Sequence, residues 1–88
     1  MTQPTLIHQV YPEYSEEARK ARFEGVVILE TIVRRDGGVD VVRVARSLGL
    51  GLDQNAIEAV KKWRFRPGTK NGAPVDVALR VEVSFNLR

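Results

Sequence analysis

The C-terminal segment from Val75 to Arg88 alternates strictly between apolar and polar positions. Every odd position is apolar, and no even position carries a large apolar side chain. This period of two is typical of a strand with one face in a hydrophobic core and the other in water. At roughly 3.3 Å per residue, such a strand reaches about 45 Å. The alternation therefore predicts one long, half-buried strand at the end of the chain.

Two further strands are expected on either side of a tight turn. Val26 to Arg35 is rich in β-branched residues, and the sequence Asp36-Gly37-Gly38 then supplies glycines that accept the backbone angles of a hairpin turn. The following strand, Val39 to Arg46, shifts the phase of its apolar alternation part-way along. Either a β-bulge near position 41 or burial of both strand faces explains that shift.

Two helices are expected from their start and stop signals. Ser15 is a good N-cap for a short helix, Glu16 to Arg22, with acidic residues at its start and basic residues at its end. Asp53 is a good N-cap for a second helix that runs to about Trp63 or Arg64. This helix carries an apolar stripe: Leu52, Ala56, Ala59, Val60 and Trp63.

The order helix, strand, strand, helix, strand predicts an α+β two-layer sandwich. Beside the second strand, the third strand would be parallel to it, and parallel strands are usually buried on both faces. The strict alternation of the third strand argues against this, so we expect it beside the first strand. The sheet then has the antiparallel order 2-1-3, with both helices on one face. Residues 1–10 are expected to form an extended N-terminal arm, and residues 11–88 the folded domain.

This order leaves the C-terminal strand at an edge of the sheet with unpaired main-chain groups. Such an edge can accept an extended peptide as an additional strand. The side chains of Arg80 and Glu82 are expected to influence which peptide binds. Gln9 and Tyr11 are expected to contact the partner, with packing of Tyr11 over the first helix as the alternative. The predicted pairing edge consists of Val77, Ala78, Leu79, Arg80, Val81, Glu82, Val83, Ser84 and Phe85.

The composition gives little support to catalysis or to cofactor and metal binding. The 88 residues include no cysteine and one histidine, His8, with no serine or aspartate beside it. The glycines of Gly49-Leu50-Gly51 lack the spacing and the lysine of a phosphate loop. We therefore expect no enzyme, no cofactor and no metal site. No apolar run is long enough to span a membrane, and the N-terminus lacks the pattern of a signal peptide.

The net charge of +3 makes a polyanion a conceivable partner. A basic run around Lys61, Lys62 and Arg64 is interleaved with Trp63 and Phe65, as in some proteins that bind single-stranded nucleic acid. The simpler interpretation is that Trp63 packs inward while the lysines extend outward. We therefore expect no nucleic-acid partner.

Several motifs together resemble the C-terminal domain family of TonB, the energy transducer of Gram-negative envelopes. The pair Tyr11-Pro12 is followed by a short helix, by Glu24-Gly25 at a strand start and by Asp36-Gly37 at the hairpin. Leu52-Asp53 and Ala59-Val60 lie in the second helix, and Gly72 precedes the alternating last strand. The most specific match is the block Trp63-Arg64-Phe65-Arg66-Pro67-Gly68.

The resemblance implies a periplasmic domain of a protein anchored in the inner membrane. An N-terminal membrane helix, absent from these residues, would bind the ExbB–ExbD proton-driven motor. The domain would capture the TonB box, a short peptide of outer-membrane transporters such as those for siderophore uptake, by strand addition. It would then transmit force to the transporter. The alternatives are a basic module that binds peptidoglycan or another polyanion, and a self-associating module that forms a homodimer through its open edge.

Overall fold

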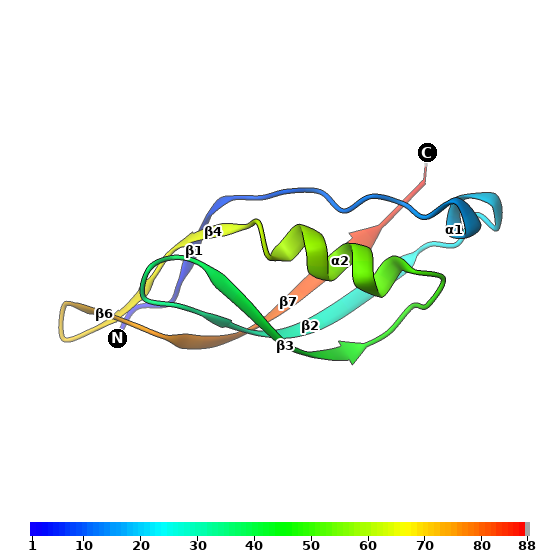
Figure 1. The fold of residues 1–88 in the computed structure, drawn as a ribbon. Coiled ribbons are helices and arrows are strands. Elements are labelled where there is room, and N and C mark those ends of the chain that lie inside the picture. The colour runs from blue at the N-terminus through cyan, green and yellow to red at the C-terminus, as the bar shows by residue number, and fades with distance from the viewer. Residues whose placement is uncertain (88) are drawn as a thin grey trace.

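A computed structural model of the protein describes residues 1–87 and shows an elongated α+β fold (Figure 1). Neither of its two helices is long and apolar enough to cross a membrane. In chain order the elements are β1 (Thr5–His8), α1 (Glu16–Lys20), β2 (Gly25–Val33), β3 (Val39–Arg46), α2 (Leu52–Val60), β4 (Arg64–Arg66), β5 (Gly68–Lys70), β6 (Ala73–Val75) and β7 (Val77–Phe85).

The main sheet has the order β3-β2-β7, which confirms the predicted 2-1-3 arrangement of the three long strands. Both pairings are antiparallel. The pairing of β2 with β7 has no irregularity from Gly25 opposite Phe85 to Val33 opposite Val77. The predicted α+β class with a three-stranded antiparallel sheet and two helices is therefore confirmed.

The core lies between one face of this sheet and the helices. Most odd positions of β2 and of β7 are buried, as alternation requires. Helix α2 lies over this face of the sheet (Figure 1). Its apolar stripe and Ala18 of α1 belong to the same buried cluster. The largest fully buried side chains are Phe85, Leu29, Leu52, Val27, Val33, Val60 and Thr31. Within residues 1–87, no helix covers the other face of the sheet (Figure 1).

The predicted bulge in the second long strand is confirmed. Glu30 lies opposite Arg43, whereas the next residue, Thr31, lies opposite Val41. Val42 is therefore the extra residue, and its side chain is 65% exposed. The bulge, rather than burial of both faces, explains the shift in the apolar alternation of β3.

The first helix begins as expected and ends earlier. Ser15 caps α1, because its Oγ accepts a hydrogen bond of 3.1 Å from the backbone N–H of Ala18. The helix stops at Lys20 rather than Arg22, since Arg22 takes a left-handed conformation with φ of 53°.

The predicted N-cap of the second helix is wrong. Gly51, with φ of 77°, is the N-cap of α2, and Asp53 lies within its first turn. The Asp53 carboxylate instead accepts hydrogen bonds from the backbone N–H groups of Leu48 and Gly49 and from the Ser47 hydroxyl. It therefore orders the preceding loop.

The structure contains four short strands that the sequence pattern did not reveal. Strand β1, in the expected N-terminal arm, pairs antiparallel with β4, and β5 pairs with β6 in a small hairpin. Because β4 already begins at Arg64, helix α2 is shorter than expected. It ends at Val60 and not at Trp63 or Arg64. The expected strand from Val75 to Arg88 is shorter in the structure: Val75 is the last residue of β6, and the long strand β7 runs only from Val77 to Phe85. Arg88 lies outside the described residues.

Candidate functional site

Strand β7 forms one edge of the main sheet, and its backbone orientation follows from the hairpin between β2 and β3. In that turn the N–H of Arg34 donates to the carbonyl of Gly38, and the carbonyl of Arg34 accepts from Gly37. The polar backbone groups of Arg34 therefore face β3. Successive residues of a strand direct their N–H and C=O groups to opposite sides, so these groups of the odd residues of β2 point toward β7.

The regular register then assigns each residue of β7 to one side. Its odd residues lie opposite the odd residues of β2, so their N–H and C=O groups are used in the ladder. Its even residues direct both groups away from the sheet. The outward-facing residues of the predicted pairing edge are Ala78, Arg80, Glu82 and Ser84.

Two side-chain contacts at the ends of this ladder agree with that assignment. Beyond one end, the N–H of Arg35 donates to Asp76 Oδ1 at 2.8 Å. Beyond the other end, the N–H of Leu87 donates to Glu24 Oε2 at 2.6 Å. Both donors belong to odd residues and lie between the two strands. The carboxylates thus satisfy donors where the ladder stops, while no strand within residues 1–87 pairs with the outer edge of β7.

A groove of about 410 Å³ lies beside the second half of this edge. It brings together two parts of the predicted site, because Gln9 and Tyr11 line it with the end of β7. Of the predicted residues, those in the groove are Gln9, Tyr11, Glu82, Val83, Ser84 and Phe85. The remaining predicted residues, Val77, Ala78, Leu79, Arg80 and Val81, occupy the first half of β7.

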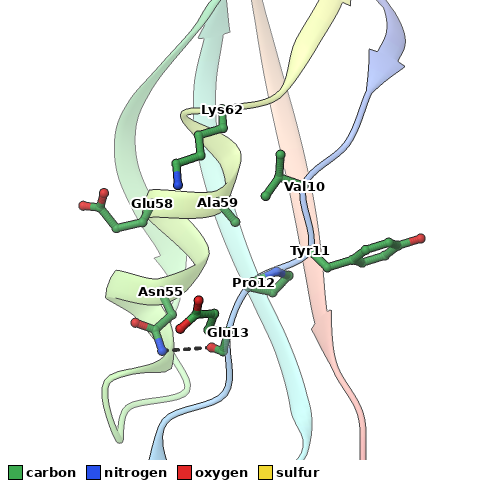
Figure 2. Close-up of a pocket in the computed structure, with 8 residues that line it drawn as sticks. All are labelled: Val10, Tyr11, Pro12, Glu13, Asn55, Glu58, Ala59 and Lys62. Atoms are coloured by element: carbon green, nitrogen blue, oxygen red, sulfur yellow. Dashed lines mark hydrogen bonds between the residues drawn. The ribbon is translucent and has the colours of Figure 1, made fainter.

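The segment that carries Gln9 and Tyr11 runs on the helix side of the sheet (Figure 1) and is fixed by side-chain hydrogen bonds. Trp63 Nε1 donates to the carbonyl of Val10 at 2.8 Å. Tyr11 itself is 79% exposed. It does not pack over α1, and Figure 2 shows its ring pointing away from α2. The exposed ring is therefore available at the groove.

Tyr14 is a groove residue that the sequence analysis missed. Its ring meets Phe85 edge-on, with 5.5 Å between the centroids, and its hydroxyl donates to the carbonyl of Phe23 at 2.7 Å. Burial, and then the negative charge of Glu24, raise the pKa of Tyr14 above its usual value. The spacing of Tyr14 from Tyr11 gave no signal, because the segment between them is neither helix nor strand.

A second cavity, of about 350 Å³, lies between this segment and α2 (Figure 2). Asn55 Nδ2 crosses it to donate to the carbonyl of Glu13 at 2.8 Å. The cavity therefore lies where the arm is tied to the helix. Its lining residues are Val10, Tyr11, Pro12, Glu13, Asn55, Glu58, Ala59 and Lys62.

The open face of the sheet carries a row of charges across its three strands. Glu30 of β2 accepts from Arg43 Nε of β3 at 3.0 Å and from an Arg80 guanidinium nitrogen of β7 at 3.2 Å. These hydrogen bonds hold the pKa of Glu30 below its usual value, and the one from Arg43 has the larger effect. The row has a net positive charge, and Arg80 is its last member at the edge.

The remaining chemical candidates lie apart from one another. His8 is exposed in β1, and residues 1–87 contain no group of three or more histidine, cysteine or acidic side chains placed to hold a metal ion. In the basic run, Trp63 and Phe65 are both 6% exposed and belong to the core. Their faces are therefore not available for stacking on nucleic-acid bases.

The fold and the edge define a small α+β domain with an open antiparallel sheet, and comparison with known proteins identifies its family. A family model described as the Gram-negative bacterial TonB protein C-terminal matches residues 10–87. The chain belongs to this TonB C-terminal family.

Relatives support the same assignment. The chain is 36% identical over 86 residues to Protein TonB of Vibrio cholerae. This match covers 96% of the present chain and 35% of that protein. It is 34% identical over 82 residues to Protein tonB2 of Pseudomonas aeruginosa, covering 92% and 30%. The chain thus spans about a third of the length of these relatives.

A solved structure has the same fold. The solution NMR structure of the Pseudomonas aeruginosa TonB CTD superposes with a TM-score of 0.70. The superposition covers 99% of this chain and 89% of that one, at 23% sequence identity.

Proposed function

We propose that this domain is the periplasmic part of an energy transducer that captures an extended peptide of an outer-membrane transporter. The peptide, of the TonB-box type, adds to the outer edge of β7 as a fourth strand. The observation that carries the proposal is the outward direction of the N–H and C=O groups of Ala78, Arg80, Glu82 and Ser84.

The groove beside the edge supports the same function. A strand paired with β7 has alternate side chains on the two faces of the sheet. Those on the helix side lie next to the groove that Gln9, Tyr11 and Tyr14 line. Main-chain pairing thus supplies affinity, and the groove selects among side chains.

In this role the domain binds and transmits force and performs no catalysis. Its N-terminal end would connect to an inner-membrane helix that engages an ExbB–ExbD motor, as the family relationship suggests. Force would then reach the bound transporter by way of the peptide paired with β7. Uptake of substrates such as siderophores would be the result.

A pair of variants at one edge residue tests the capture step. A Ser84→Pro variant lacks one outward N–H, whereas Ser84→Ala keeps it. With a synthetic peptide from the periplasmic N-terminus of a TonB-dependent transporter, we expect Ser84→Pro to weaken binding at least tenfold and Ser84→Ala to change it little. Isothermal titration calorimetry gives the dissociation constants, and circular dichroism checks the fold. Equal binding by the two variants would refute capture at this edge.

Salt dependence separates this function from binding of peptidoglycan or another polyanion. Binding to a dense polyanion weakens steeply between about 50 and 200 mM salt, because counterions compete for the basic residues. Backbone pairing is expected to change less than threefold over this range. A steep loss of peptide affinity would favour the polyanion function.

A further inference from the structure

A hollow of about 410 Å³ lies on the face of the main sheet opposite α2, and we call it the open-face hollow (Figure 1). Its walls include the side chains of Ile32, Val42 and Ala78 and the ion pair of Glu30 with Arg80. We propose that it receives one large apolar side chain of the captured peptide. This inference rests on the proposed function and adds a side-chain requirement that main-chain pairing alone does not impose.

The β-bulge in β3 gives the hollow one of its apolar walls. Adjacent residues of a regular strand have their side chains on opposite faces of the sheet. At the bulge, Arg43 reaches Glu30 on the open face, and its neighbour Val42 lines the hollow on that same face. Bulges redirect side chains in this way beside functional sites. Here the bulge brings an apolar side chain to the surface, where it is 65% exposed.

The polar groups around the hollow are paired with one another. Glu30 accepts from Arg43 Nε at 3.0 Å and from an Arg80 guanidinium nitrogen at 3.2 Å. The hydroxyl of Thr31, which also lines the hollow, donates to the carbonyl of Leu79 at 2.7 Å. The surface that the hollow offers to a ligand is accordingly mostly apolar. An apolar side chain gains free energy by leaving water there, whereas a polar side chain loses its contacts with water.

Ala78 connects the hollow to the outer edge of β7. It is one of the four outward-facing residues, so its N–H and C=O groups are directed toward a captured strand. The peptide residue directly opposite Ala78 shares its face of the sheet, and paired strands lie about 4.8 Å apart. Because Ala78 has only a methyl group, a leucine or phenylalanine opposite it can extend across it toward Ile32, which pairs with Ala78 in β2. The hollow therefore selects the peptide residue opposite Ala78.

The hollow and the groove described above contact different residues of the peptide. The groove lies on the helix side beside the second half of β7, whereas the hollow lies on the other face beside Ala78 and Arg80. Side chains of a strand alternate between the two faces. The residue at the hollow is therefore separated from each residue at the groove by an odd number of positions.

A scan of the peptide tests this inference. Each position of a synthetic peptide from the periplasmic N-terminus of a TonB-dependent transporter is replaced in turn by leucine and by serine, and calorimetric titration gives the dissociation constants. With the unmodified protein, we expect one open-face position at which leucine binds about three- to tenfold more tightly than serine. In a Val42→Ser variant this preference should fall below about twofold, while preferences at other positions persist. Val42→Ala should reduce it part of the way.

Ile7→Ser is the matched control, because Ile7 is 64% exposed, like Val42, but lies in β1. It should leave every preference unchanged, and circular dichroism checks that all variants are folded. A leucine preference that the Val42 variants leave intact, or that Ile7→Ser lowers equally, would overturn the role of the hollow. The Ser84 variants separate this result from capture itself: equal binding by those two variants would refute both proposals, whereas capture without an effect of Val42 would refute only this one.

Discussion

The indole Nε1 of Trp63 donates a hydrogen bond of 2.8 Å to the carbonyl oxygen of Val10, across 53 positions of sequence. Trp63 is 6% exposed, and Tyr11 next to Val10 is 79% exposed. The core tryptophan thus fixes the backbone from which an exposed tyrosine extends beside the edge of β7. This contact links the helix-end motif to the candidate binding groove.

Replacing Trp63 with phenylalanine should weaken both the fold and the arm. The variant loses the hydrogen bond and part of the buried ring, so we expect the free energy of unfolding to fall by about 1–3 kcal/mol. Urea denaturation measures this loss. Amide hydrogen exchange near Val10 should accelerate more than exchange in β2, and an unchanged rate there would contradict the anchoring role.

Replacing Tyr11 with alanine should separate binding from stability. Its ring is exposed, so the free energy of unfolding should change by less than about 0.5 kcal/mol. If the ring contacts the captured peptide, affinity should fall about three- to tenfold. Calorimetric titration with the transporter peptide measures this, and full retention of affinity would remove Tyr11 from the site.

Replacing Gly37 with alanine should be severely destabilising. Its φ is 88°, and an added Cβ would lie 2.5 Å from the carbonyl oxygen of Phe65. The Phe65 N–H also donates to the Gly37 carbonyl at 2.9 Å, so the hairpin turn is held against β4. We expect a loss of about 2 kcal/mol or more.

Gly72→Ala is the matched control for that variant. Gly72 has φ of 80°, but nothing lies within 4 Å of an added Cβ. Only the backbone cost of about 1–2 kcal/mol should remain. Equal losses in the two variants, measured by thermal unfolding, would show that the approach of the turn to Phe65 is unimportant.

Asp53 should make stability depend on acid pH. Partial burial raises its pKa, but hydrogen bonds from Ser47, Leu48 and Gly49 outweigh this and hold the pKa below the usual value. Its stabilising contribution is therefore complete above about pH 4, the ordinary value for aspartate, and is lost as pH falls through the lower folded-state pKa.

The Asp53→Asn variant measures this contribution. At pH 7 it should be less stable than the original protein by about 1–2 kcal/mol, because charge-assisted hydrogen bonds are weakened. The difference in the free energy of unfolding between the two proteins should become smaller as the pH approaches 3. Urea unfolding at pH 7, 5 and 3 checks this, and a gap that is constant with pH would show that the charge is not responsible.

The sequence predicted the long elements because their signals are local. Strict alternation identified the strand that became β7, and the glycines after Asp36 identified the hairpin. Strands β1 and β4 were missed because they have four and three residues and exist through pairing with each other. Segments this short carry no periodicity.

The candidate site was predicted in part. An open edge followed from the element order, but the assignment of outward groups to even residues required the register fixed at Arg34. The position of Asp53 was misjudged because its residue type suits both an N-cap and a loop acceptor. Tyr14 was missed because its contact with Phe85 joins residues that are distant in sequence.

The β2–β7 ladder has nine residue pairs in unbroken register. Beyond its two ends, the carboxylates of Asp76 and Glu24 accept hydrogen bonds from backbone N–H groups. A pull along the axis of β7 therefore loads all these bonds in shear, at the same time, and does not peel them one after another. The end contacts resist fraying, which is where peeling would begin. Single-molecule stretching should consequently give a higher rupture force when the domain is pulled along β7 than when it is pulled across it.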